Sequence, residues 1–126
     1  MVNNHGALIV AAGRGSRMGG VTQSQPKCLT LLADQTLLKW QIDALKGAGA
    51  NPISAIGGYR YEMLEQFISV SFVNSRWNET GVVRTLSCAS DFLCEYPNIV
   101  SYSDILYGVD HVARLINSDN DLAIIY

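Results

Sequence analysis

A glycine-rich loop follows the first strongly apolar segment of this 126-residue chain. It begins Gly13-Arg-Gly-Ser-Arg-Met18. Glycine lets backbone N–H groups approach an anion closely, and arginine adds a positive charge suited to phosphate. We therefore expect backbone donors from Gly13, Gly15 and Ser16, and a contact between Arg17 and a triphosphate.

Three kinds of phosphate-binding loop compete for this segment. A dinucleotide site requires a third glycine where this chain has Met18, and a carboxylate after the second strand, where it has Ile56-Gly-Gly-Tyr59. A P-loop requires lysine after Gly20, where this chain has Val21. A nucleotidyltransferase loop meets neither objection and also gives a role to the lysine that follows.

Two further residues carry charges suited to a nucleotide. Lys27 follows Pro26, which stiffens the backbone, and we expect it to contact the α-phosphate and the transition state. Asp104 follows the apolar segment 99–103. Mg²⁺ prefers one or two carboxylates together with substrate phosphate oxygens, so we expect Asp104 to bind Mg²⁺. A turn or helix-capping role is the alternative for Asp104.

The elements that must position these residues alternate between strand-type and helix-type patterns. We predict strands over 7–12, 52–57, 70–73, 99–103 and 122–126, and helices over 38–49, 61–68, 82–93 and 109–116. This alternation predicts an α/β fold with a parallel sheet and helices on both faces. Ligands of such sheets bind beyond the carboxyl ends of the strands, where Gly13 and Asp104 are expected.

Composition excludes several function classes. Hydrophobic residues make up 48% and charged residues 16%, which is typical of one globular domain. The formal net charge of -2 argues against a broad nucleic-acid surface. No apolar run is long enough to span a membrane, and no secretory signal is visible. The three cysteines lack metal-site spacing, so we expect free thiols and a cytoplasmic protein.

The loop and the lysine together resemble the signature of the NTP-transferase family. The matching stretches are Ala11-Ala-Gly-Arg-Gly-Ser-Arg-Met18 and Pro26-Lys27-Cys28-Leu29. The family includes sugar-1-phosphate nucleotidyltransferases and small cytidylyltransferases. The resemblance implies a Rossmann-like three-layer sandwich with a mostly parallel sheet, with Ala11 and Ala12 beside the base and Asp104 as a metal ligand.

The middle of the chain resembles the cytidylyltransferases that act on phosphocholine or 2-aminoethylphosphonate. The stretch runs from Asn74 to Leu86, with Gly81 where those enzymes have asparagine and Thr85 where they have serine. Thr85 keeps the hydroxyl and is expected either to bind the base or to lie at the edge of the core.

The resemblance therefore implies transfer of CMP from CTP to a small phosphate- or phosphonate-bearing acceptor, with Mg²⁺ as cofactor and pyrophosphate as product. One alternative is a sugar-1-phosphate nucleotidyltransferase, and another is a catalytically silent nucleotide-binding or regulatory domain.

The resemblance also bears on the extent of the domain. Residues 1–126 correspond to an N-terminal, NTP-binding portion, and the chain stops within a predicted strand. The family's second acidic metal ligand is expected beyond Tyr126. We therefore expect the chain alone to be weakly active or inactive.

Overall fold

A four-stranded parallel sheet forms the centre of the molecule. The computed structural model describes residues 5–13 and 25–125, and the strand order is β5-β4-β1-β6. The strands are β1 (Gly6–Ala11), β4 (Ile53–Gly57), β5 (Val70–Val73) and β6 (Asn98–Tyr102). Each neighbouring pair is parallel, so all four strands end at the same edge of the sheet.

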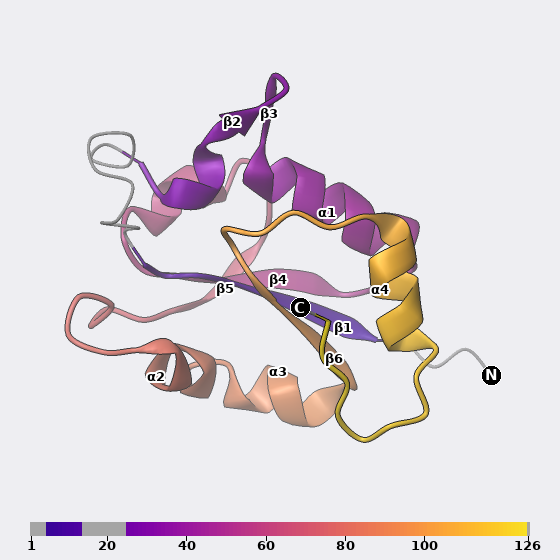
Figure 1. Ribbon diagram of the computed structural model, residues 1–126. Coiled ribbons are helices and arrows are strands. Elements are labelled where there is room, and N and C mark those ends of the chain that lie inside the picture. The colour runs from indigo at the N-terminus through magenta and orange to yellow at the C-terminus, as the bar shows by residue number, and fades with distance from the viewer. Residues whose placement is uncertain (1–4, 14–24, 126) are drawn as a thin grey trace.

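Helices cover both faces of this sheet, as Figure 1 shows. On one face lie α1 (Leu37–Gly47) and α4 (Val109–Ile116), and on the other α2 (Val82–Ser87) and α3 (Ser90–Glu95). Parallel strands joined through helices require this arrangement, since each crossover must pass over a face. The predicted Rossmann-like three-layer α/β fold is therefore confirmed.

The alternating side chains of β1 divide between two hydrophobic cores. Ala7, Ile9 and Ala11 pack in the core beneath α1 and α4. Leu8 faces the opposite way and packs in the smaller core beneath α2 and α3. Because β1 is covered on both faces, its sequence is apolar without interruption, as is typical of a central parallel strand.

Helix α1 is set by a cap and an apolar stripe. The Thr36 hydroxyl accepts a hydrogen bond from the Lys39 backbone N–H at 3.1 Å and so caps the first turn. Leu38, Gln41, Ile42 and Leu45 are buried at the three- and four-residue spacing of one helical face. Gln41 is the polar member of that stripe.

A short hairpin before α1 was not predicted. It consists of β2 (Leu31–Leu32) and β3 (Gln35–Thr36), joined by Ala33 and Asp34 at positive φ. Two consecutive residues in the left-handed region are typical of tight two-residue hairpin turns. Their pairing is too short to stand out from a loop in the sequence.

Two of the predicted helices differ in the structure. The segment 61–68 forms only a 3-10 helix, η3 (Tyr61–Leu64), followed by a turn. The helix predicted over 82–93 is two helices, α2 and α3. Cys88 and Ala89 donate to carbonyls three residues back, which tightens the backbone and ends α2.

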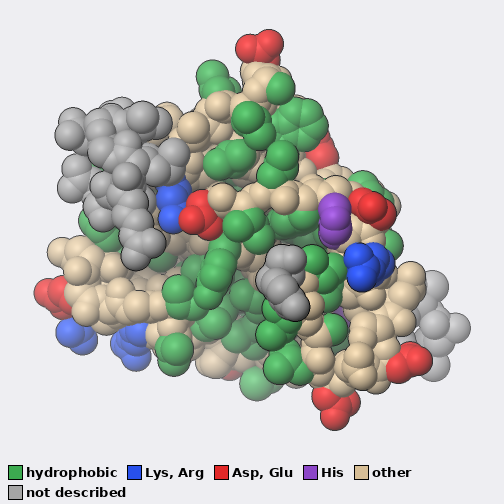
Figure 2. All heavy atoms as spheres, in the orientation of Figure 1, with side chains coloured by type: hydrophobic (Ala, Val, Ile, Leu, Met, Phe, Trp, Pro, Cys, Tyr) green, Lys and Arg blue, Asp and Glu red, His purple; other side chains and the backbone are tan. Residues whose placement is uncertain are grey.

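The strand predicted over 122–126 is wrong for the described residues 122–125, which form no strand. Leu122 is 79% exposed and Ile124 is 72% exposed. An apolar run becomes a strand only where a neighbouring strand supplies hydrogen-bond partners, which the run itself does not specify. In the space-filling view, hydrophobic side chains gather over β6 and the segment after α4 (Figure 2).

Candidate active site

The sheet order brings together residues from distant parts of the sequence. Because β1 and β6 are neighbours, the chain segments that leave their carboxyl ends start side by side. The Lys27 ammonium lies 3.0 Å from a carboxylate oxygen of Asp104, which is 77 residues away. The structure thus pairs the two residues for which the sequence suggested a phosphate contact and a metal ligand.

Lys27 begins a short helix whose other residues are buried. It opens the 3-10 helix η2 (Lys27–Leu29), whose Cys28 and Leu29 are buried. Pro26, also buried, precedes the helix. Burial raises the pKa of the Cys28 thiol to about 12, so this side chain is an uncharged part of the core. Neighbours anchored in this way hold the Lys27 backbone while its side chain reaches outward.

Asp104 lies in the turn directly after β6. Ser103 before it is buried, whereas the Asp104 side chain is 47% exposed and open to ligands. No group of three or more His, Cys, Asp or Glu side chains suited to a metal occurs in the described part of the chain. A single accessible carboxylate fits Mg²⁺ bound together with substrate phosphates, and does not fit an ion held by protein side chains alone.

The end of β1 is packed closely against the segment that follows β4. The Ala12 carbonyl accepts a hydrogen bond from the Tyr59 N–H at 2.9 Å. A Cβ atom on Gly58 would lie 2.6 Å from the Ala12 carbonyl oxygen and 2.8 Å from the Cβ of Trp77. Glycine is therefore required at position 58 for the backbones to approach. This contact fixes the direction in which the chain enters the glycine-rich loop.

The three described residues at the start of that loop have different surroundings. Ala11 and Ala12 are buried, and the Ala11 side chain belongs to the core. Gly13 is exposed, with open space where a Cβ atom would lie. Gly15, Ser16 and Arg17, also expected at the site, lie outside the described residues.

A buried asparagine organises the loop that follows β5. The Asn74 amide nitrogen donates to the hydroxyls of Thr80 and Thr85, each at 3.0 Å. The Asn74 side-chain oxygen accepts from the Arg76 N–H at 3.0 Å. Asn74 and Thr85 are 3% and 5% exposed, so the bond between them is shielded from water, and the other two are partly shielded. The loop 75–81 is thereby closed onto the first turns of α2.

Thr85 is engaged within this network on both sides. Its hydroxyl accepts from Asn74 and donates to the Gly81 carbonyl at 3.2 Å. This geometry favours the core-edge alternative for Thr85 over a contact with a base. No role for Asn74 is predicted from the sequence, because its burial and its hydrogen bonds are visible only in the structure.

Aromatic and charged side chains lie on the same loop. Trp77 contacts Tyr59 edge to face, with ring centroids 5.1 Å apart. The Arg76 guanidinium is paired with Glu79 at 3.0 Å, with both side chains exposed. Tyr107, which follows β6 and packs against the core beneath α1 and α4, donates its hydroxyl to Ser101 at 2.7 Å. Burial raises the pKa of Tyr107, which keeps it neutral.

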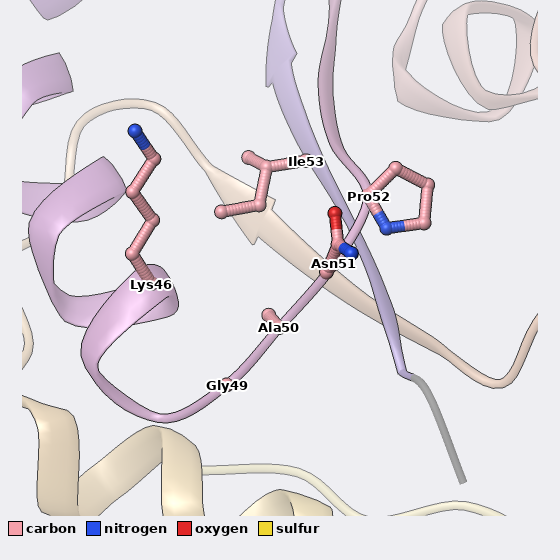
Figure 3. A pocket seen from close by; sticks show the side chains of 6 residues that line it. All are labelled: Lys46, Gly49, Ala50, Asn51, Pro52 and Ile53. Atoms are coloured by element: carbon pink, nitrogen blue, oxygen red, sulfur yellow. The ribbon is translucent and has the colours of Figure 1, made fainter. Parts of the chain in front are cut away.

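A hollow elsewhere on the molecule lies at the opposite edge of the sheet. Figure 3 shows its lining, which runs from Lys46 at the end of α1 through Gly49 to Ile53 at the beginning of β4. Parallel strands start at this edge, so the hollow is remote from Asp104. Lys46 is the one charged residue among those that line it.

Comparison with known proteins identifies the chain's family. The sequence model of the MobA-like NTP transferase domain matches residues 7–126. The chain belongs to the MobA-like NTP transferase family. This match includes every described residue of the site, from Ala11 through Asp104.

Two of the curated relatives that the chain matches are named as cytidylyltransferases. The chain is 38% identical to the CTP:phosphoglutamine cytidylyltransferase of Campylobacter jejuni, over 94% of this chain and 51% of that protein. It is 29% identical to the 2-aminoethylphosphonate cytidylyltransferase of Lancefieldella rimae, over 84% of this chain and 45% of that protein. The chain thus spans about half the length of the curated relatives that it matches.

A solved structure supports the same grouping. The CTP:phosphocholine cytidylyltransferase of Streptococcus pneumoniae superimposes with a TM-score of 0.74 at 26% identity, over 80% of this chain and 45% of that one. The MobA-like NTP transferase fold is therefore shown by sequence and by structure.

Among the described residues, no helix is both long and apolar enough to cross a membrane.

Proposed function

We propose that this chain binds CTP and takes part in transferring CMP to a small acceptor that carries a phosphate or phosphonate. The observation that carries the proposal is the Lys27–Asp104 pair at the carboxyl edge of the sheet. The three relatives compared above are each named for CTP-dependent transfer to such an acceptor. A cytoplasmic location is part of the proposal, since CTP is the substrate and the cysteines are free.

The chemistry needs charge neutralisation more than proton transfer. An oxygen of the acceptor attacks the α-phosphorus of CTP, the bond to the β-phosphate oxygen breaks, and pyrophosphate leaves. The attacking oxygen is already anionic, so the reaction requires no strong general base. Positioning and electrostatic stabilisation then provide most of the rate enhancement.

We assign parts in this scheme to the residues at the carboxyl edge of the sheet and to the glycine-rich loop. The positively charged Lys27 ammonium lies next to the α-phosphate and stabilises the negative charge that develops there. The backbone at Ala12 and Gly13 leads the glycine-rich loop toward the phosphates, and we propose that Gly15, Ser16 and Arg17 bind them. Asp104 would hold Mg²⁺, which neutralises phosphate charge when bound. The ion pair seen in the structure keeps both Lys27 and Asp104 at the place where nucleotide is expected.

Nucleotide binding is the first test of this function. We would measure dissociation constants for CTP, ATP, GTP and UTP by calorimetry with Mg²⁺ present. The proposal requires CTP to bind most tightly and requires Lys27→Ala and Asp104→Asn to weaken it. Lys39→Ala, which removes another ion-paired surface lysine, serves as the matched control. Equal affinity for all four nucleotides, or none, would contradict the choice of CTP.

Pyrophosphate release then separates the reaction classes. CTP and Mg²⁺ would be supplied with phosphocholine, 2-aminoethylphosphonate or glucose-1-phosphate. Release with one of the two amine-bearing acceptors supports the proposal. Release with glucose-1-phosphate alone would indicate a sugar-1-phosphate nucleotidyltransferase. Tight CTP binding without release from any acceptor, both by this chain and by a longer protein that contains it, would indicate a nucleotide-binding domain without this chemistry.

A further inference from the structure

A buried glutamine reaches from α1 to the turn that carries Asp104. Gln41 is 0% exposed. Its side-chain nitrogen donates to the Tyr102 carbonyl at 3.1 Å and to the Ile105 carbonyl at 2.6 Å. Tyr102 and Ile105 flank Ser103 and Asp104 in the sequence. One amide group therefore holds both ends of the two-residue turn between β6 and the segment leading to α4.

The orientation of this amide follows from its partners. Both neighbours are carbonyl oxygens, which only accept hydrogen bonds, so the NH₂ group of Gln41 must face them. The other end of the amide, Oε1, is buried and has no hydrogen-bond partner within the described residues. An apolar side chain at this position would avoid that unpaired oxygen. The two bonds to the turn are thus made at the expense of an unsatisfied acceptor.

The rest of the buried face of α1 serves packing. Leu38, Ile42 and Leu45 are apolar and belong to the core beneath the helix. Gln41 alone in this stripe reaches the backbone after β6 with its side chain. Gln41 is itself fully buried, so its two bonds are partly shielded from water and fix the turn more firmly than exposed bonds would.

We propose that Gln41 is a positioning residue that fixes the turn Ser103–Asp104 and so directs the Asp104 carboxylate toward Lys27 and the bound nucleotide. The inference rests on the proposed function, in which Asp104 meets the metal-bound phosphates. Gln41 touches neither substrate nor metal and acts only through the backbone of the turn. Loss of its donor group leaves the Tyr102 and Ile105 carbonyls without this anchor, and the carboxylate loses its fixed position.

The first test follows the turn in the absence of any ligand. Gln41→Met has a similar length and lacks the donor, and Gln41→Asn is a second variant that keeps the amide but shortens its reach. Ile42→Val, a buried substitution on the same helix, is the control. Backbone chemical shifts of residues 102–106 should change in both Gln41 variants and remain unchanged in Ile42→Val. Unchanged shifts in the Gln41 variants would overturn the role of Gln41.

The second test concerns metal-assisted nucleotide binding. CTP dissociation constants would be measured with EDTA and with Mg²⁺, and their ratio compared. The dissociation constant in EDTA divided by that in Mg²⁺ should fall to about one in Asp104→Asn. In Gln41→Met this ratio should be at least fivefold lower than in the unmodified chain, with CTP affinity in EDTA unaltered. A variant that merely loses its fold would instead bind CTP more weakly both in EDTA and in Mg²⁺.

The outcomes separate the two proposals. A Gln41→Met ratio equal to that of the unmodified chain, with Asp104→Asn defective, would overturn the Gln41 proposal alone. A normal ratio in Asp104→Asn would overturn the metal role within the proposed function, even if the Gln41 variants had altered chemical shifts.

Discussion

Lys27 and Asp104 form a pair whose contribution to stability is small and whose proposed contribution to chemistry is large. Their side chains are 25% and 47% exposed, and ion pairs of this kind contribute about 0–1 kcal/mol to folding. Charge placed next to a reacting phosphate counts for more, because it acts where negative charge develops. Substitution at either position should therefore separate folding from function.

We expect Lys27→Ala to lower pyrophosphate release from CTP about 100-fold or more, in line with the loss of one electrostatic contact to a transition state. Because residues 1–126 alone are expected to be weakly active, a longer protein that contains them is the one to assay. The midpoint of thermal unfolding should change little. Pyrophosphate release and thermal denaturation measure the two effects. Lys39→Ala should leave both unchanged. Near-normal release from Lys27→Ala would show that this ammonium does not act on the phosphate.

Thr85 distinguishes a structural hydroxyl from one that binds the base. Thr85→Val keeps the shape but deprives Asn74 of a buried acceptor, which should destabilise the fold by about 1–3 kcal/mol. Thr85→Ser retains the hydroxyl and should lose less. Urea unfolding measures both. If Thr85→Val instead kept its stability and lost only CTP affinity, the base-contact interpretation would be restored.

Single residues can be suggested from the sequence, whereas the contacts between them cannot. Lys27 was predicted from its charge and the preceding Pro26, and Asp104 from its place after an apolar segment, yet no local pattern places them 3.0 Å apart. That distance depends on β6 pairing with β1, a choice made by the whole sheet. Gln41 was missed because its helix was considered only for its apolar spacing, although a polar residue within that stripe was itself a signal.

At the scale of elements, the meeting of β1 and β4 at the carboxyl edge controls entry into the glycine-rich loop. Gly58 makes this possible by leaving room for the Ala12 carbonyl and for Trp77. This close approach explains why adding a Cβ atom at position 58 should affect nucleotide binding. The added atom would meet the Ala12 backbone, which relaxes less readily than a side chain.

We expect Gly58→Ala to cost about 1–3 kcal/mol of folding free energy, as is usual for overpacking a tight site. It should also weaken CTP binding by displacing Ala12. Gly81→Ala is the control, since a Cβ atom there meets open space and the less favourable N-cap residue should cost only about 1 kcal/mol or less. Denaturation and calorimetry measure these effects. Equal costs for the two variants would contradict the account of Gly58.

The four strands of the sheet were predicted from apolar runs, although only β1 and β4 are buried along most of their length. In β5 and β6, buried or half-buried positions alternate with exposed ones. The pattern over 82–93 is helical throughout, but it does not contain the tight turn at Cys88 and Ala89 that divides it. The segment 61–68 lies in a short connection, where η3 forms only one turn after Arg60 enters the left-handed region. Such local geometry does not alter hydrophobic periodicity.

At the scale of the whole molecule, a buried thiol and a buried phenol make the free energy of unfolding fall at alkaline pH. Burial raises the pKa of Cys28 from 9.0 to about 12, and it also raises the pKa of Tyr107. The folded state therefore retains protons that the unfolded state loses. Stability from this source is complete below about pH 9 and is lost as the pH rises toward 12.

Unfolding free energies measured at pH 8 and pH 10.5 should show this loss. For Cys28, the unfolding free energy should fall by about 1.4 kcal/mol per pH unit between the pKa of the unfolded state and that of the folded state. Cys28→Ala should be less stable at pH 8 because of the cavity, yet should lose less on going to pH 10.5. A pH dependence identical to that of the unmodified chain would show that Cys28 ionises normally. Labelling by a thiol reagent at pH 8 should reach exposed Cys94 long before Cys28.

The position of β6 at the end of the sheet order has a practical consequence for handling the protein. Among the described residues no strand pairs with its outer edge, and Val100 and Tyr102 on it are exposed. An open edge of this kind is a template for adding a strand from another molecule. We expect this chain to self-associate as its concentration rises, as seen by light scattering, and Val100→Lys to delay that association. Dilute samples are therefore the appropriate starting point for every binding measurement on this molecule.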